Sequence, residues 1–312
     1  MGVILAMDIG GTQLRAAVYP TNNKTPLEIK RAATRGQEPG AFDRLTALID
    51  SIWPQEPVEA ISIAIPGPIN PYTGFIIETP NISSLSKFPI GEKLTERYHV
   101  PVFAGNDANL AALGEWHYGA GIGHHDLVYM TISTGIGGGV IAHDQLLLGS
   151  HGLAAELGHV TVLPDGPMCS CGQRGHLEGI ASGPGITRYV IEKLAGGISS
   201  SLAAKSNLTT LDIAEAAAYG DELARAAFAY AGGYIGLALA NYLQIFNPSI
   251  VILGGGVSQS GGLILDPIIT SLQQHVMDPY YLEGFELTTA RLGDDVGLLG
   301  ALAQAHIQLA EK

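Results

Sequence analysis

Short apolar blocks separated by glycine, proline and asparagine run through the chain, and longer segments repeat an apolar residue every three or four positions. Blocks of the first kind predict buried strands, and segments of the second kind predict helices. Strands are predicted at residues 3–7, 14–19, 27–33, 58–65, 100–103, 127–133, 140–147, 250–253 and 286–289. Helices are predicted at residues 41–53, 91–98, 110–116, 263–276 and 296–310. This mixture is typical of an α/β protein.

A unit made of a strand, a glycine-rich turn and a second strand occurs twice in this pattern. It spans residues 3–19 and returns at residues 127–147. Because the two units are equivalent, we expect their turns to face each other across a cleft between two domains. The length of 312 residues agrees with this division, since chains of this size usually form more than one core.

Charge and composition argue against several classes of partner. The formal net charge is −13 and no lysine or arginine run occurs, which disfavours nucleic acids and anionic membranes. Residues 226–246 carry no charge and are long enough to span a bilayer. Gly232, Gly233 and Asn241 interrupt them, so a buried core helix is favoured. The chain has only two cysteines, which favours a reducing compartment and a cytoplasmic protein.

The glycine-rich turns combine bare N–H groups with hydroxyl side chains. They lie at residues 8–12 and 134–139, and a third glycine cluster follows a strand at residues 254–256. Such groups can form an anion-binding nest, so we interpret the turns as phosphate-binding, although tight hairpins also require glycine. Asp8 lies beside the first turn, where its carboxylate could hold hydrated Mg²⁺ near the phosphates.

Asn106 and Asp107 lie between a predicted strand and a predicted helix, with side chains free to face the cleft. One interpretation makes Asp107 the N-cap of the helix, a position that aspartate favours. The other makes it the carboxylate that acts between the two phosphate-binding turns. Residues 106–109 hold more hydrogen-bonding side chains than a cap needs, which favours the second interpretation.

A loop rich in glycine and proline carries a possible metal site. Its candidate ligands are His159, Cys169, Cys171 and His176. A disulfide across one residue is strained, whereas two thiols and two imidazoles complete a structural Cys₂His₂ zinc site. In the alternative, His176 points to solvent and Asp165 or a water completes the shell. Glu156 and Glu178 flank the ligands and remain free to bind a polar molecule.

Together these motifs resemble the ROK family of sugar kinases and repressors, within the actin/hexokinase/Hsp70 superfamily. The resemblance covers essentially the whole chain and rests on residues 8–12, 105–109, 133–139, 156–159, 169–175 and 254–256. Residues 158–178 look most like the glucokinase branch. Two positions depart from the family pattern: His176 stands where a third cysteine is usual, and residues 87–89 stand near a usual Gly-Trp pair.

The resemblance implies an α/β, two-domain actin-like ATPase (ribonuclease H-like) fold with an interdomain cleft. Its small N-terminal domain would comprise residues 1–117 plus 297–312, and its large domain, with the zinc loop, residues 118–296. The implied reaction transfers the γ-phosphoryl group of Mg-ATP to the 6-hydroxyl of glucose, with Asp107 as the base. The implied sugar-binding residues are Gly67, Asn81, Asn106, Asp107, Glu156, His159 and Glu178. The implied nucleotide-binding residues are Asp8, Gly10, Gly11, Thr12, Thr134, Gly135, Gly254, Gly255 and Gly256.

Several alternatives stay open within this resemblance. The same scaffold phosphorylates N-acetylmannosamine, N-acetylglucosamine, fructose or allose, and the donor could be ATP or polyphosphate. The family's repressors carry a DNA-binding segment before the first glycine turn, for which Asp8, as the eighth residue, leaves no room. A non-catalytic sugar-binding protein is disfavoured because Asp8, Asp107 and both turns are intact. The resemblance also implies a homodimer or a larger homo-oligomer.

Overall fold

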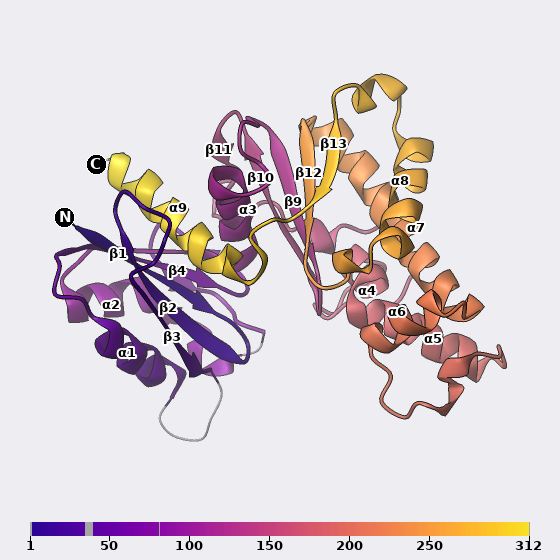
Figure 1. Cartoon of the computed structure of the whole chain (residues 1–312), viewed down its shortest axis with the longest axis horizontal. Helices are drawn as coiled ribbons and strands as arrows, with labels where there is room; N and C mark the ends of the chain where they lie inside the picture. Colours follow the sequence, from indigo (N-terminus) through magenta and orange to yellow (C-terminus); the bar gives the residue numbers. More distant parts are fainter. Residues whose placement is uncertain (1, 35–39, 81, 312) are drawn as a thin grey trace.

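The computed structural model of the chain describes residues 2–34, 40–80 and 82–311. Within this part, two five-stranded sheets carry the fold (Figure 1). The first sheet contains, in spatial order, β3 (Glu28–Ala33), β2 (Gln13–Pro20), β1 (Val3–Ile9), β4 (Val58–Ile65) and β8 (Val102–Asn106). The second contains β11 (Gln145–Leu146), β10 (Ile136–Ala142), β9 (Leu127–Ile132), β12 (Ile250–Gly254) and β13 (Glu286–Thr289). A small third sheet contains β5 (Ile69–Asn70), β6 (Phe75–Ile76) and β7 (Phe88–Pro89).

The two large sheets repeat one topology. In the first, β1 pairs antiparallel with β2 and parallel with β4. In the second, β9 pairs antiparallel with β10 and parallel with β12. Both β1 and β9 are buried along nearly their whole length, as their continuous apolar runs predict. The duplicated strand–turn–strand unit and the α/β fold class are therefore confirmed.

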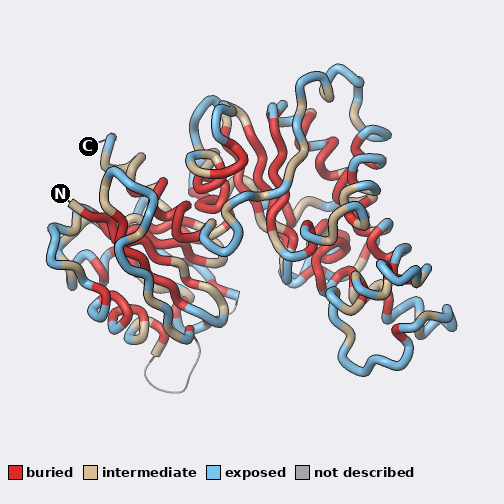
Figure 2. The backbone as a smooth tube through the Cα atoms, viewed as in Figure 1, coloured by how far each residue is buried: buried red, intermediate tan, exposed pale blue. Residues whose placement is uncertain are grey.

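Helices cover the outer face of each sheet. The helix α1 (Ala41–Ile52) packs on β2 and β3, and α2 (Ile90–Tyr98) packs on β8. The second sheet shares its core with a layer of helices that contains α4 (Leu177–Ala181), α5 (Gly183–Ala195), α6 (Thr210–Ala218), α7 (Glu222–Phe246) and α8 (Gly262–His275). Figure 2 shows the strands of both sheets largely buried, with exposed loops around them.

The long helix α7 is the central member of this layer. Among the described helices it is the one long and apolar enough to cross a membrane by length and composition. It packs instead against α4, α5, α6 and α8. Gly232 and Gly236 permit this close approach, because a Cβ atom at either position would lie within 3 Å of atoms of α8. The buried core helix predicted from the sequence is confirmed.

Two helices lie between the sheets and join them. The helix α9 (Val296–Ala310) packs on β1 and β4, while α3 (Asp107–Tyr118) packs on β9 and β10 and also on α9 (Figure 1). The two helices cross at glycines, since a Cβ atom at Gly300 would lie 2.0 Å from the Leu110 carbonyl oxygen. Residues from both sheets and both helices share one apolar cluster. The domain limits expected at residues 117/118 and 296/297 stay a prediction.

The second glycine turn is shorter than the sequence predicts. Residues 134–139 were expected to form one turn, but β10 already begins at Ile136 and includes Gly137, Gly138 and Gly139. These glycines permit close packing of the strand on α3, because a Cβ atom at Gly139 would lie 2.7 Å from the Cβ atom of Ala112. The strand expected at residues 140–147 is also divided, by a turn in which His143 and Asp144 have φ of 52° and 62°.

Candidate active site

The junction between β8 and α3 holds the first group of candidate residues. Asn106 is the N-cap of α3, because its Oδ1 accepts hydrogen bonds from the Ala108 N–H (3.0 Å) and the Asn109 N–H (3.1 Å). Its Nδ2 donates to the Gly67 carbonyl oxygen at 3.1 Å. The interpretation of Asp107 as the N-cap is therefore wrong. Asp107 is instead the first residue of the helix, where its carboxylate is left for another role.

Asp107 is half-buried and lies among other acidic groups. Its Oδ1 accepts a hydrogen bond from the Ala108 N–H at 2.8 Å, which favours the ionised form. Burial has the larger effect, and together with the negative charges of Asp8 and Glu156 it raises the pKa of Asp107 to about 7. A carboxyl group with this pKa exchanges its proton at neutral pH, which is the property a general base needs.

Asp8 lies near the end of β1, beside the first glycine turn. Burial raises the pKa of its carboxyl group, while the positive charge of Arg15 opposes the rise. Arg15, on the adjacent strand β2, forms an ion pair with Asp295 just before α9. The Asp8 carboxylate also lies against Gly297 in the first turn of α9, where a Cβ atom would come 2.6 Å from its Cγ. The N-terminus of α9 and Arg15 both stabilise the ionised carboxylate.

The first glycine turn presents free donors next to Asp8. The Gly10 N–H donates to the Gln13 carbonyl oxygen (2.9 Å), and the Gly10 carbonyl accepts from Thr34 Oγ1 (2.6 Å). Within the described residues, the N–H groups of Gly11 and Thr12 have no acceptor. Two adjacent free N–H groups beside a carboxylate suit a phosphate with its divalent cation.

The second and third glycine turns lie side by side. The Val257 N–H donates to the Ile132 carbonyl oxygen at 3.0 Å, which places residues 254–256 next to residues 133–135. Gly255 has φ of +82°, and a Cβ atom there would lie 2.3 Å from that same carbonyl oxygen. In the part of the chain that the structure describes, the N–H groups of Thr134 and Gly135 lack acceptors. The backbones of these two turns are therefore in contact.

The predicted metal ligands come together in the loop before α4. The potential ligand atoms of His159, Cys169, Cys171 and His176 all lie within 4.8 Å of one another. Cys169 Sγ is 3.5 Å from His159 Nδ1, and Cys171 Sγ is 3.3 Å from His176 Nδ1. Tetrahedral zinc with ordinary bond lengths separates its sulfur and nitrogen ligands by roughly 3.3–3.8 Å. The four side chains therefore fit a zinc ion, and His176 lies within the set.

Glu178, in the first turn of α4, connects this loop to the second glycine turn. Its Oε2 accepts a hydrogen bond from the Ile136 N–H at 3.0 Å. Its Oε1 accepts from Ser170 Oγ (2.5 Å) and from Cys169 Sγ (3.3 Å). The cysteine loop therefore fixes the position of the Glu178 carboxylate. The sequence pattern did not identify Ser170 as part of this arrangement, because a serine between two cysteines has no distinctive spacing.

Glu156 and His159 form the remaining side of the site. The Glu156 Oε2 and His159 Nε2 atoms are 4.0 Å apart, while His159 Nδ1 faces Cys169. Burial, aided by the negative charge of Glu178, raises the pKa of Glu156. Asn81, the other residue expected in the sugar pocket, lies outside the described residues. Arg15 was missed by the sequence analysis, since a lone arginine within an apolar strand carries no recognisable motif.

The duplicated sheets and the helices between them define an α/β protein of the actin-like ATPase fold. The ROK family model matches residues 4–308. A glucokinase of Thermotoga maritima is 34% identical over 304 residues, covering 96% of this chain and 95% of the relative. An N-acetylmannosamine kinase of Salmonella typhi is 32% identical over 303 residues, covering 97% and 98%. A ROK glucokinase of Streptomyces griseus, solved with glucose and AMPPNP, is 34% identical with a TM-score of 0.78, covering 98% and 100%. The chain belongs to the ROK family.

Proposed function

We propose that this ROK protein transfers the γ-phosphoryl group of ATP to the 6-hydroxyl of glucose. At the coarser level the chain is a sugar kinase, since it aligns over nearly its whole length with relatives that phosphorylate sugars. The glucose-specific form of the proposal rests on the glucokinase relatives and on a structural neighbour solved with glucose and AMPPNP.

The observation that carries the proposal is the carboxyl group of Asp107, whose pKa is raised to about 7 by burial and by the negative charges of Asp8 and Glu156. In the proposed reaction the 6-hydroxyl oxygen attacks the γ-phosphorus of ATP and the bond to the β-phosphate oxygen breaks. ADP leaves, and Asp107 accepts the hydroxyl proton. Positioning contributes most of the rate enhancement in phosphoryl transfer, so the base must lie within hydrogen-bond reach of that hydroxyl.

Each remaining group of the site has a proposed partner on the substrates. The sugar hydroxyls would be bound by Gly67, Asn81, Asn106, Glu156, His159 and Glu178. The phosphates would be bound by Asp8, Gly10, Gly11, Thr12, Thr134 and Gly135, and the adenosine would lie against Gly254, Gly255 and Gly256. Mg²⁺, when bound near Asp8, neutralises charge on the phosphates. The free N–H groups of the first two turns support this assignment.

We further propose that residues 1–117 plus 297–312 and residues 118–296 move as two bodies that close on the substrates. The distribution of the candidate residues supports this, since Asp8 and Asp107 belong to the first body and Glu156 to the second, and the charges of Asp8 and Glu156 both raise the pKa of Asp107. The proposed zinc ion, held by the Cys₂His₂ set, would fix the loop from which the Ser170 hydroxyl donates to Glu178. A cytoplasmic homodimer or larger homo-oligomer remains our expectation for the assembled protein.

A panel assay tests the proposal. Purified protein with Mg-ATP is given glucose, N-acetylmannosamine, N-acetylglucosamine, fructose or allose in turn, and ADP release is measured. The largest kcat/KM is expected for glucose, and polyphosphate in place of ATP tests the donor. A larger kcat/KM for N-acetylmannosamine than for glucose would show that the chain shares the specificity of the N-acetylmannosamine kinase relative. Absence of ADP release with every sugar would refute the proposed activity.

A further inference from the structure

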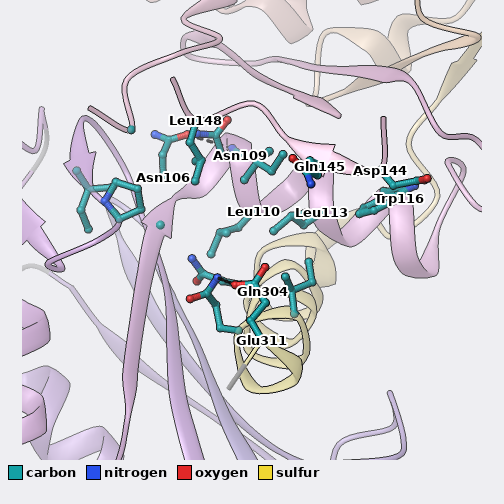
Figure 3. Close-up of a pocket in the computed structure, with 17 residues that line it drawn as sticks. Asn106, Asn109, Leu110, Leu113, Trp116, Asp144, Gln145, Leu148, Gln304 and Glu311 are labelled. Atoms are coloured by element: carbon teal, nitrogen blue, oxygen red, sulfur yellow. Dashed lines mark hydrogen bonds between the residues drawn. The ribbon is translucent and has the colours of Figure 1, made fainter. Parts of the chain in front are cut away.

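A cavity of about 390 Å³ lies on the side of α3 that faces α9 and β11. Its size falls within the range of small-molecule sites. Its walls come from both large sheets: Gly105 belongs to β8 of the first, and Leu146 belongs to β11 of the second. Figure 3 shows Leu110 and Leu113 of α3 pointing into it, opposite Gln304 of α9. Of the described residues assigned to sugar or nucleotide above, Asn106 alone lines this cavity.

The chemistry of the lining selects an uncharged ligand. Leucine and isoleucine side chains form the apolar surface, and amide side chains supply the polar groups. The described residues that line the cavity include the carboxylates of Asp144 and Glu311 but no lysine, arginine or histidine. Asp144 Oδ1 lies 2.7 Å from His125 Nδ1, outside the lining. Because the lining itself offers an anion two carboxylates and no basic side chain, phosphate esters and carboxylates are disfavoured here.

Asn109 provides the second observation. Its side chain lines the cavity, the residue is only 5% exposed, and its Oδ1 has no hydrogen-bond partner among the described residues. A buried polar atom without a partner is costly. Because an amide can rotate by half a turn to exchange its oxygen and nitrogen, Asn109 can offer the cavity either a donor or an acceptor.

We propose that this cavity binds a neutral small molecule that combines an apolar body with an amide or hydroxyl group. The apolar body would contact Leu110 and Leu113, and the polar group would form a hydrogen bond with the amide group of Asn109. Such a ligand would also contact walls that belong to different sheets. It would therefore be sensitive to the relative position of the two halves of the chain.

Asn106 couples the cavity to the candidate active site. Asn106 is among the residues that line the cavity, while its Nδ2 donates to the Gly67 carbonyl and its Oδ1 caps the helix that begins with Asp107. A ligand in the cavity is thus expected to change sugar affinity, and the sugar must change the ligand's affinity by the same factor. This coupling rests on the proposed function, whereas ligand binding in the cavity does not.

The two tryptophans of the chain provide a direct test of binding. Trp116 lines the cavity, and its Nε1 donates to the His124 carbonyl at 2.7 Å. Trp53 stacks on Tyr98 at the end of α1 and serves as an internal control. The indole ¹H–¹⁵N signals are followed during titration with benzamide and acetanilide as neutral probes and with benzoate as an anionic probe. Saturable shifts of Trp116 alone are expected with the neutral probes.

A matched pair of variants locates the site. Gln308→Phe fills the cavity from α9 and is expected to abolish the Trp116 shift while leaving phosphorylation of sugar unchanged. Gln273→Phe, an exposed position on α8, should leave the shift intact. No Trp116 shift with either neutral probe, or an unchanged shift in Gln308→Phe, would overturn the site.

Glucose titrations with and without saturating benzamide test the coupling. The glucose dissociation constant is expected to change by about 5-fold or more, and to stay constant in Gln308→Phe. Binding of the probe without any effect on glucose affinity would overturn the coupling. Failure to bind or phosphorylate any sugar, with probe binding intact, would instead refute the proposed function and leave the cavity site standing.

Discussion

Replacement of Asp107 by asparagine is expected to raise stability while it removes activity. The asparagine side chain keeps the size of aspartate and can keep the hydrogen bond from the Ala108 N–H. It cannot accept a proton, so kcat should fall roughly 10²- to 10⁴-fold, the range for loss of a general base. The helix should remain capped, because Asn106 is the N-cap.

The magnitude of the stability change follows from the pKa. Folding raises the pKa of Asp107 from its ordinary value of 3.8 to about 7. The shift of 7 − 3.8, about 3 units, corresponds to an upper limit of about 4 kcal/mol. Solvent access to a half-buried group reduces this to about 2 kcal/mol. The ionised carboxylate therefore destabilises the folded chain, and a neutral amide removes that cost.

The sign of the pH dependence is specific to a raised carboxyl pKa. Between pH 3.8 and 7 the folded chain keeps a proton that the unfolded chain has released, so the wild type loses stability as pH rises through this window. The advantage of Asp107→Asn should therefore be absent near pH 4, grow through the window and be complete above pH 7. In the wild type, kcat should rise with pH along a limb near 7.

Urea unfolding of the sugar-free proteins at pH 4.5, 6 and 8 measures this difference. Asn106→Ala is the matched neighbour, and it should lose about 0.5–2 kcal/mol at every pH because it removes the cap. If Asp107→Asn were destabilising at pH 8, the account of its burial would be refuted. If it retained wild-type kcat, its assignment as the base would be refuted.

Three further changes test other parts of the site and fold. Glu178→Gln is expected to raise the glucose dissociation constant about 10- to 150-fold, because a charge-assisted hydrogen bond is lost. Calorimetry should find the nucleotide affinity unchanged, and equal weakening of glucose and nucleotide binding would contradict the role of Glu178 in sugar binding. In metal analysis, His176→Ala is expected to lose zinc, whereas His176→Cys should keep one equivalent. His143, which is exposed, supplies the control variant His143→Ala. Full zinc content in His176→Ala would exclude His176 as a ligand. Gly139→Ala should lower stability by about 1–3 kcal/mol, because its Cβ atom would overlap α3. Gly233→Ala has open space around it and should raise stability by roughly 0.5–1 kcal/mol. Thermal unfolding measures both, and a more stable Gly139→Ala than Gly233→Ala would contradict the packing.

The sequence was informative where local pattern decides structure. The largely buried strand β4 (Val58–Ile65) has the bounds that its apolar run predicts, and the partly exposed strand β13 (Glu286–Thr289) also has its predicted bounds. The Cys₂His₂ set was also predictable, because four metal-binding side chains within one loop leave few other arrangements. The strand bounds around the second glycine turn were not predictable from the sequence. Gly137 to Gly139 read as a turn locally, but their role is set by the approach of α3.

Contacts between distant residues account for the rest of what the sequence could not reveal. Arg15 pairs with Asp295 across most of the chain, and Glu178 accepts a hydrogen bond from Ile136 on another element. Neither pair has a spacing or motif of its own. The raised pKa of Asp107 likewise depends on Asp8 and Glu156, which the fold brings together from separate segments.

The position of the transferred phosphate on the product tests the central claim most directly. Glucose and Mg-ATP are incubated with the wild-type protein, and the product is examined by ¹H–³¹P correlation NMR. We predict a single phosphoester coupled to the protons at carbon 6, formed with one ADP per ester and absent with Asp107→Asn. Transfer to another position, or no phosphoester from glucose while ADP accumulates, would contradict the account.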